Sequence, residues 1–481
     1  MNNERRSNMT FLQDARILIN ALDEYYRDSV SAEKPAIAQQ PLEKIITDLK
    51  LALYSHEGGL TGDRLAEFIR DYLPTTTRLH HPGYMSHQVA VPHYAGALAA
   101  LIDTFTNNVM AIYEMGPGAA SIEYHVINVL LKKIGWEPAP LNLRQVPYSQ
   151  AYAGGVLTHG GSLTNLTALI AARTRLVPDV WDVGIPQDLA ILAPADSHYS
   201  IARAAGILGI GRNAIYELDV DDTGAIIPEK LTPAYDRMRT DGRRAIALVA
   251  NACSTAVGIY DPLDEIGDFC NEHDIWFHVD GAHGASALFS KKHRTLMKGI
   301  EKANSITWDA HKLMRTPTVC AALLVKDHRD LDAAFKQEAS YLFHDKEQPG
   351  FDFIHRTVEC TKAGLGLKFF FVLAAMGEQG IADYIDRQYD LAKNAWDYLE
   401  QLDDFTCPVR PQSNILCFRV DGDDEVQIRI RNRLNEQGRF YISTTSFMGS
   451  RYLRLSLMSP HTSMQDIEDL VHNIRRIMEE K

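Results

Sequence analysis

The chain lacks the sequence features of secreted, membrane-spanning and redox-active proteins. No stretch reaches the roughly eighteen apolar residues of a membrane span, and the start, MNNERRSNMTFLQDARIL, contains no continuous apolar core of a signal peptide. The six cysteines are scattered without a CxxC pair, which argues against a zinc site or a redox motif. We therefore expect a cytoplasmic chain with reduced thiols, no membrane partner and no metal.

Basic residues are also few relative to acidic ones. The 49 Lys and Arg residues stand against 62 Asp and Glu residues, for a formal net charge of −13. Nucleic acids and anionic membranes both require clustered Lys and Arg, so we expect neither as a partner. The glycine-rich segment GILGIG follows a helix-like run and not a strand, which makes an NAD-binding fingerprint a poor interpretation.

The length of 481 residues suggests two or three domains. We expect a helical N-terminal dimerisation segment at residues 1–95, a large domain at 96–375 and a small C-terminal domain at 376–481. Apolar strand-like runs alternate with helical patterns over residues 155–327, which predicts a mostly parallel, doubly wound α/β sheet.

Two short apolar runs in this region end in reactive side chains. IWFHVDGAHGA (275–285) carries Asp280 at the end of its apolar part, and NSITWDAHK (304–312) ends in an acid, a histidine and Lys312. Ligands of open α/β sheets bind at the carboxyl ends of the strands, so both runs are expected to direct polar groups into one crevice. A lysine at that position can form a Schiff base.

A glycine-rich segment precedes a long helical run in GGVLTHGGSLTNLTALIAA. Gly160 and Gly161 allow the backbone to approach a ligand closely, and Ser162 is the expected N-cap of the helix. A phosphate placed there gains free backbone N–H groups and the positive end of the helix dipole. Read in isolation, a GGS at a helix start is also compatible with an ordinary loop.

These motifs, in this order, resemble those of the pyridoxal-5′-phosphate (PLP) dependent group II amino acid decarboxylases, which include the glutamate, cysteine sulfinate, aromatic and diaminobutyrate decarboxylases. The resemblance rests on HVDGAHG and DAHK and extends from about Leu79 to the C-terminus. It implies the PLP-dependent type I, aspartate aminotransferase-like fold, with a mostly parallel seven-stranded sheet, a helical N-terminal arm and a small α+β C-terminal domain. It also implies a homodimer with its active site at the interface.

The resemblance further implies decarboxylation of an L-amino acid to an amine and carbon dioxide, with Lys312, His198 and Asp280 as catalytic residues. Lys312 matches the lysine that holds PLP as a Schiff base, and Asp280 matches the partner of the pyridine nitrogen. His198 and Ala282 match residues on opposite faces of the cofactor ring. The residues expected to bind PLP are Gly161, Ser162, His198, Thr255, Asp280, Ala282, His311 and Lys312.

Two further residues are expected to bind the substrate. Arg454 in RYLRLSLM matches the family arginine that grips the α-carboxylate, and His87 lies in a segment that matches the substrate side of the pocket. Each site residue taken singly has a structural alternative: Asp280 as a cap on a strand end, His198 as a core histidine, Lys312 and Arg454 as surface residues. Taken together, the structural alternatives would require several motifs to coincide at successive strand ends.

The sequence departs from the family in one segment. The glutamate and cysteine sulfinate branch carries a loop tyrosine that reprotonates Cα, whereas this chain has no tyrosine between Tyr341 and Tyr384. His344 or His355 is a candidate general acid in its place.

The alternative functions are an aldehyde synthase or other carbon–carbon lyase of the same fold, and a non-catalytic PLP-fold protein. The motifs leave acidic, aromatic and diamino acids open as substrates.

Overall fold

A computed structural model describes residues 10–141, 149–335 and 350–480. Its internal contacts divide the chain into two units. The first unit comprises residues 1–87, 394–407 and 416–481, and the second comprises residues 88–393 and 408–415. This division differs from the three segments expected from the sequence, whose boundaries stay a prediction.

The second unit is built around a seven-stranded sheet in the order β1-β7-β6-β5-β4-β2-β3. Only β7 runs antiparallel to its neighbours in this sheet, so the predicted mostly parallel arrangement is confirmed. Five of the strands, β1, β2, β5, β6 and β7, are buried along their whole length, as expected for a sheet covered on both faces. The strands are β1 (Gly154–Thr158), β2 (Leu189–Pro194), β3 (Ile215–Leu218), β4 (Arg244–Asn251), β5 (Phe277–Asp280), β6 (Ser305–Asp309) and β7 (Ala321–Val325).

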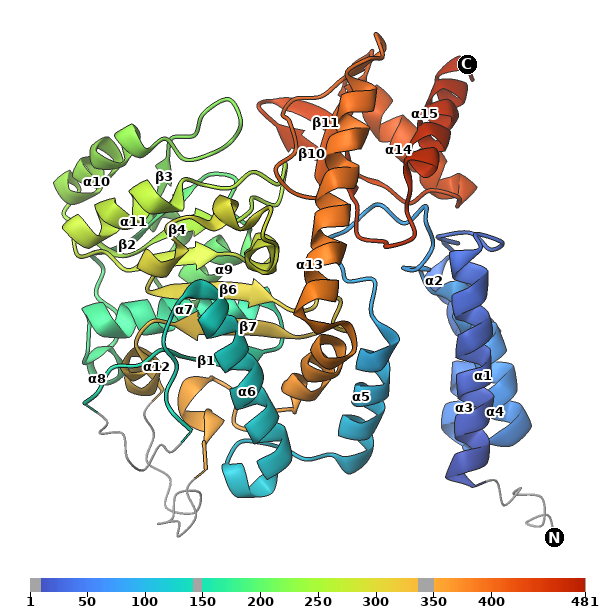
Figure 1. The fold of residues 1–481 in the computed structure, drawn as a ribbon, viewed down its shortest axis with the longest axis horizontal. Coiled ribbons are helices and arrows are strands. Elements are labelled where there is room, and N and C mark those ends of the chain that lie inside the picture. Colours follow the sequence, from blue (N-terminus) through green and yellow to red (C-terminus); the bar gives the residue numbers. More distant parts are fainter. Residues whose placement is uncertain (1–9, 142–148, 336–349, 481) are drawn as a thin grey trace. The chain divides into compact units, whose positions relative to one another are not determined.

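Helices cover both faces of this sheet (Figure 1). Helix α7 packs against β1, β4, β6, β7 and α9, while α10 contacts β2, β3 and β4, and α11 contacts β4. Local sequence sets the helix ends: α6 begins with a proline in its first turn and ends at Gly135, which adopts the left-handed conformation (φ 93°). The helices are α5 (Tyr94–Thr106), α6 (Pro117–Ile134), α7 (Gly161–Leu176), α8 (Val180–Val183), α9 (Ser200–Ile207), α10 (Leu231–Thr240), α11 (Leu263–Glu272) and α12 (His328–Ala334).

Helix α13 (Leu365–Leu399) runs from the second unit into the first. Among the described residues it alone is long and apolar enough to cross a membrane by length and composition. The backbone leaves helical geometry at Gly377 (φ 68°, ψ 169°), which divides α13 into two shorter helices. Buried side chains such as Phe369, Val372 and Tyr389 show that it packs inside the protein. The expectation of no membrane partner stays a prediction.

The first unit combines the N-terminal helices with a four-stranded sheet in the order β10-β11-β9-β8. Helix α1 packs against α4, and the Tyr25 hydroxyl bonds to the Thr76 hydroxyl at 2.8 Å. The backbone of Met85 bonds to Tyr441 and Ser456, which ties the end of the N-terminal segment to this sheet. The elements are α1 (Phe11–Val30), α2 (Leu42–Asp48), α3 (Leu51–Glu57), α4 (Gly62–Tyr72), β8 (Phe405–Thr406), β9 (Ile415–Val420), α14 (Asp424–Gln437), β10 (Ser443–Phe447), β11 (Ser450–Ser456) and α15 (Met464–Glu479).

Candidate active site

A cavity of about 240 Å³ lies at the carboxyl ends of the parallel strands of the second unit. The loops that follow β1, β2, β4, β5 and β6 all contribute to its wall. All eight residues expected from the sequence to bind PLP line this one cavity. Parallel strands end at the same edge of a sheet, which explains how residues far apart in sequence meet there.

The glycine-rich segment forms one wall of the cavity. Strand β1 ends at Thr158, Gly160 is the N-cap of α7 with φ 104°, and within the described residues no side chain caps the helix. A Cβ atom on Gly161 would lie 2.9 Å from Asp309 Oδ2, so only glycine fits there without a shift. The predicted N-cap Ser162 is wrong: Ser162 lies in the first turn, because the helix already begins at Gly161.

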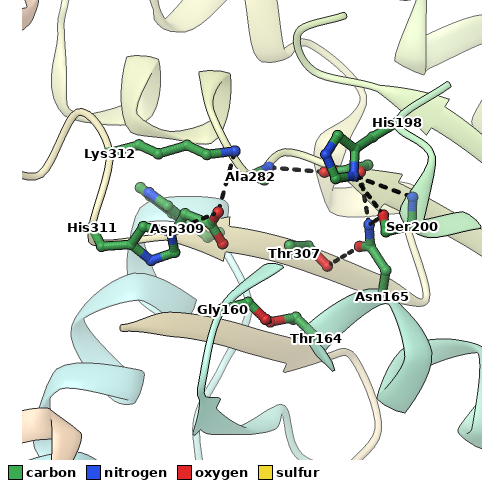
Figure 2. Close-up of polar contacts among 12 residues, drawn as sticks. Gly160, Thr164, Asn165, His198, Ser200, Ala282, Thr307, Asp309, His311 and Lys312 are labelled. Carbon is green, nitrogen blue, oxygen red and sulfur yellow. Dashed lines mark hydrogen bonds and ion pairs between the residues drawn. The ribbon is translucent and has the colours of Figure 1, made fainter. Parts of the chain in front are cut away.

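Asp280 ends β5 and is 6% exposed. Its Oδ2 accepts a hydrogen bond from Asn165 Nδ2 at 2.8 Å, and its Oδ1 accepts one from the Ala282 backbone at 3.2 Å. The two donors, the Asn165 amide and the Ala282 backbone, thus fix the carboxylate at the cavity wall; both residues are labelled in Figure 2.

His198 follows β2 and lies near the start of α9. Its Nδ1 lies 2.7 Å from the Ser200 hydroxyl, which also accepts a hydrogen bond from Asn165 Nδ2 at 2.9 Å. Burial lowers the pKa of His198, while the charge of Asp280 opposes that shift. The imidazole is therefore neutral near neutral pH.

Lys312 and His311 lie just after β6, next to Asp309. Lys312 Nζ lies 3.2 Å from Asp309 Oδ2, and His311 Nε2 lies 3.5 Å from the same oxygen (Figure 2). His311 Nδ1 lies 2.8 Å from the Cys320 carbonyl, which fixes the ring. The other Asp309 oxygen, Oδ1, is buried and has no hydrogen-bond partner among the described residues.

The structure adds cavity residues that the sequence interpretation missed. Asn165 lies one helical turn after Gly161, and Asp309 is the first residue of DAHK, so both could have been found from their distance to the motifs. His159 pairs through Nδ1 with Glu359 Oε1 at 2.6 Å, and His283 Nε2 lies 2.6 Å from Asn414 Oδ1. These two pairs join residues more than a hundred positions apart, which no local pattern reveals.

The two residues expected to bind substrate belong to the first unit. Arg454 in β11 is 6% exposed, and its Nη1 donates to the Ser86 carbonyl at 3.3 Å. His87 Nε2 lies 3.1 Å from the Tyr441 hydroxyl, and burial, aided by the charge of Arg454, lowers the pKa of His87. Their role in substrate binding stays a prediction.

The candidate general acids differ in what the structure says of them. His355 lies in the short 3₁₀-helix η9 (Phe353–Arg356). It is not one of the described residues that line the cavity. His344 lies outside the described residues.

The chemistry of the cavity fits PLP. An amine at Lys312, a carboxylate at Asp280 and an uncapped helix N-terminus beside two glycines match the aldehyde, the pyridine nitrogen and the phosphate of this cofactor. A cavity of this composition at the strand ends of a mostly parallel seven-stranded sheet defines a PLP-dependent enzyme of the type I fold.

Comparison with known proteins identifies the family. The family model of the pyridoxal-dependent decarboxylase conserved domain matches residues 60–421. The chain therefore belongs to the pyridoxal-dependent decarboxylase family. The resemblance to the group II amino acid decarboxylases is confirmed, and with it the type I fold, the cofactor PLP and a carboxy-lyase activity, the PLP-dependent decarboxylation of an amino acid.

Individual relatives cover almost the whole chain. The acidic amino acid decarboxylase GADL1 of Mus musculus is 27% identical over 96% of this chain and 85% of its own length. The cysteine sulfinic acid decarboxylase of Rattus norvegicus is 29% identical over 82% of this chain and 78% of its own length. The crystal structure of mouse CSAD in apo form superposes with a TM-score of 0.87 at 25% identity, covering 97% of this chain and 98% of that one.

Proposed function

We propose that the cavity at the strand ends is the active site, and that Lys312 holds PLP covalently through its side-chain amine. The observation that carries this assignment is the convergence of Lys312, Asp280 and the N-terminus of α7 on one cavity. Gly161 and Ser162 would hold the phosphate at the helix N-terminus, and the Asp280 carboxylate would accept a hydrogen bond from the protonated ring nitrogen. When bound, PLP supplies a protonated pyridine that takes up the electron pair left by the departing carboxylate.

The remaining cavity residues orient and enclose the cofactor. His198, neutral and held by Ser200, would pack on one face of the ring, and Ala282 would pack on the other. Thr255, from the loop after β4, and His311, fixed by Cys320, also line the cavity and would complete the wall around the cofactor. These residues exclude water and keep the ring plane fixed relative to the amine of Lys312.

For substrate binding we propose Arg454 and His87. The guanidinium of Arg454 can meet both oxygens of an α-carboxylate, and its burial strengthens such a contact. For the side chain we propose an acidic group, because the names of the two relatives specify acidic amino acids and cysteine sulfinic acid. An acidic side chain carries a second anion for the pocket to bind.

For the protonation of Cα we propose a histidine in place of the missing loop tyrosine, either His344 or His355. Each is changed in turn to Asn, and the amine and carbon dioxide released per turnover are measured. A loss of amine in one variant, with aldehyde appearing instead, identifies the proton donor. Unchanged amine yield in both variants refutes the assignment.

We also propose that the enzyme is a cytoplasmic homodimer with its active site at the interface. Apolar side chains are exposed along α1, including Phe11, Leu18 and Leu22, and along α5, including Leu98 and Phe105. Exposed apolar stripes of this kind mark protein–protein interfaces, and a second copy of the chain offers matching apolar surfaces. Mass measurement in solution tests the oligomeric state.

The test of the main proposal starts from the absorbance spectrum of the protein purified with PLP. Borohydride reduction should remove the visible band and leave the label on Lys312, as located by peptide mass spectrometry. L-Aspartate, L-glutamate and L-cysteine sulfinate are then assayed with aromatic and diamino acids for release of amine and carbon dioxide. Release of aldehyde, ammonia and peroxide instead identifies an aldehyde synthase. A label on another lysine refutes the assignment of Lys312.

A further inference from the structure

Asn165 lies at the centre of a buried hydrogen-bond network at the wall of the cavity. Its Nδ2 donates to Asp280 at 2.8 Å and to Ser200 at 2.9 Å, and Ser200 in turn contacts His198. The Asn165 side chain, 1% exposed, is thus hydrogen-bonded to Asp280 and linked to His198 through Ser200, and both of these residues are proposed to contact the cofactor ring. Figure 2 shows it between Ser200 and Thr307.

The other end of the Asn165 amide is equally constrained. Its Oδ1 lies 2.6 Å from the Thr307 hydroxyl and 3.1 Å from His278 Nε2. The amide nitrogen faces a carboxylate, which only accepts hydrogen bonds, so the amide oxygen must face His278. An amide oxygen only accepts as well, and therefore His278 Nε2 must carry a hydrogen.

The surroundings of His278 support this tautomer. His278 is fully buried in β5, and its Nδ1 lies 2.8 Å from the Ser305 hydroxyl. Trp276 Nε1 donates to that hydroxyl at 2.8 Å, which leaves the Ser305 hydrogen free to point at His278 Nδ1. Burial lowers the pKa of His278 to about 4, against the effect of the Asp280 charge, so the ring is neutral near neutral pH.

We propose that Asn165 is a positioning residue that couples Asp280 to His198, and that neutral His278, with its hydrogen on Nε2, fixes the orientation of the Asn165 amide. A reversed amide would turn its oxygen toward Asp280 and repel the carboxylate. The network thus holds the carboxylate as an acceptor for the ring nitrogen of the cofactor. This inference rests on the proposed role of Asp280.

The test measures the protonation of the cofactor ring, not activity. Each variant is loaded with PLP that carries nitrogen-15 in the ring, and the nitrogen chemical shift is recorded at slightly alkaline pH. His278→Gln keeps a donor near the Nε2 position, whereas His278→Met removes it at similar volume. We expect a protonated ring nitrogen in the wild type and in His278→Gln, and a shift toward the unprotonated signal in His278→Met and Asn165→Leu.

The affinity of the apoenzyme for PLP gives a second readout. Loss of the Asn165 hydrogen bond to the charged Asp280 should weaken binding by about tenfold in Asn165→Leu. His278→Met, which removes the donor that orients the Asn165 amide, should weaken it in the same direction. Thr307→Val, a nearly isosteric change, removes one donor to the amide oxygen and should show a smaller effect in the same direction. If His278→Met and Asn165→Leu fail to fold, the PLP affinity of Thr307→Val tests the proposal. Ser286→Ala, which removes a buried hydrogen bond to Trp308 at 3.0 Å outside the network, is the matched control.

The outcomes separate this inference from its premise. If Asp280→Asn leaves the ring nitrogen signal unchanged, the proposed role of Asp280 fails, and the inference fails with it. If Asp280→Asn removes the protonated signal while the Asn165, His278 and Thr307 variants match Ser286→Ala, only the network is refuted. Loss in His278→Met with retention in His278→Gln supports the proposal, since a merely structural role would not be rescued by a donor alone.

Discussion

The buried ion pair between Glu123 and Lys362 offers a stringent test of how the cavity is supported. Both side chains are 0% exposed, and Lys362 Nζ lies 2.8 Å from Glu123 Oε2. The other Glu123 oxygen accepts a hydrogen bond at 2.8 Å from the Leu157 backbone, in the strand that leads to Gly160. The pair therefore joins α6, β1 and the segment before α13.

Removing the lysine alone should be costly. Lys362→Met leaves a carboxylate buried without its cation, and breaking a buried pair in this way costs about 3–5 kcal/mol. The double variant Glu123→Gln with Lys362→Met keeps an acceptor for Leu157 and removes both charges. We expect it to recover most of the lost stability, because neutral groups of similar volume often replace a buried pair with little net change.

The pH dependence of Lys362→Met gives the sign of the effect. Burial raises the pKa of Glu123, and Lys362 normally opposes that shift. Without Lys362 the folded state favours the protonated acid, so its stability is greatest below the unfolded pKa and falls as pH rises toward the folded pKa. Lys362→Met should thus be less destabilised near pH 5 than near pH 8, by about 1.4 kcal/mol for each pH unit that separates pH 5 from the folded pKa.

Urea titrations of the apoenzyme at both pH values, followed by circular dichroism, measure these differences. The double variant should show no pH dependence beyond that of the wild type, because it has no acid at position 123. If Lys362→Met unfolds within about 1 kcal/mol of the wild type at the higher pH, or if its loss of stability is the same at both, the reasoning is wrong.

Three further changes probe the site and the surface. Gly161→Ala should weaken PLP binding in a fluorescence titration because its Cβ would crowd Asp309, whereas Gly118→Ala, which meets nothing within 4 Å, should not. Lys312→Met should abolish the borohydride-stable label and amine release, and a label retained in full would exclude Lys312 as the anchor. Phe105→Glu, on the exposed stripe of α5, should shift the solution mass from dimer toward monomer; an unchanged mass would mean that this stripe is not in the dimer interface.

The sequence was sufficient to predict the residues at the strand ends. Asp280 and Lys312 each come at or just after a short, fully buried and mostly apolar segment, and such a segment bounded by turn residues is typical of an interior strand. Once the strands are parallel, their ends share one edge, so the meeting of Asp280, Lys312 and Gly161 follows from local patterns alone.

Other features depended on packing that local patterns do not encode. The break of α13 at Gly377 lies within a continuous helical pattern, and a single glycine inside such a pattern does not by itself predict a kink. Ser162 was expected to cap α7 because serine favours that position, yet Gly160 occupies it with a positive φ that serine would rarely adopt. The pairing of His159 with Glu359 spans 200 positions and depends on tertiary packing.

The buried polar residues around the cavity divide into two sets with different physical roles. Asp280 and Lys312 lie at the strand ends and are proposed to act on the cofactor, whereas His278 and Thr307 both hydrogen-bond to Asn165 and form a second set with it. If apolar side chains replaced Asn165, His278 and Thr307, the Asp280 carboxylate would be free to rotate. Its buried charge would also lose a hydrogen-bond donor, which destabilises the folded state. Because Asn165, His278 and Thr307 each direct their donors and acceptors at a neighbouring residue, the network permits one orientation of the carboxylate. If the orientation of Asp280 is set by this second set of residues, as we propose, their substitution should change the ring protonation before it changes the fold.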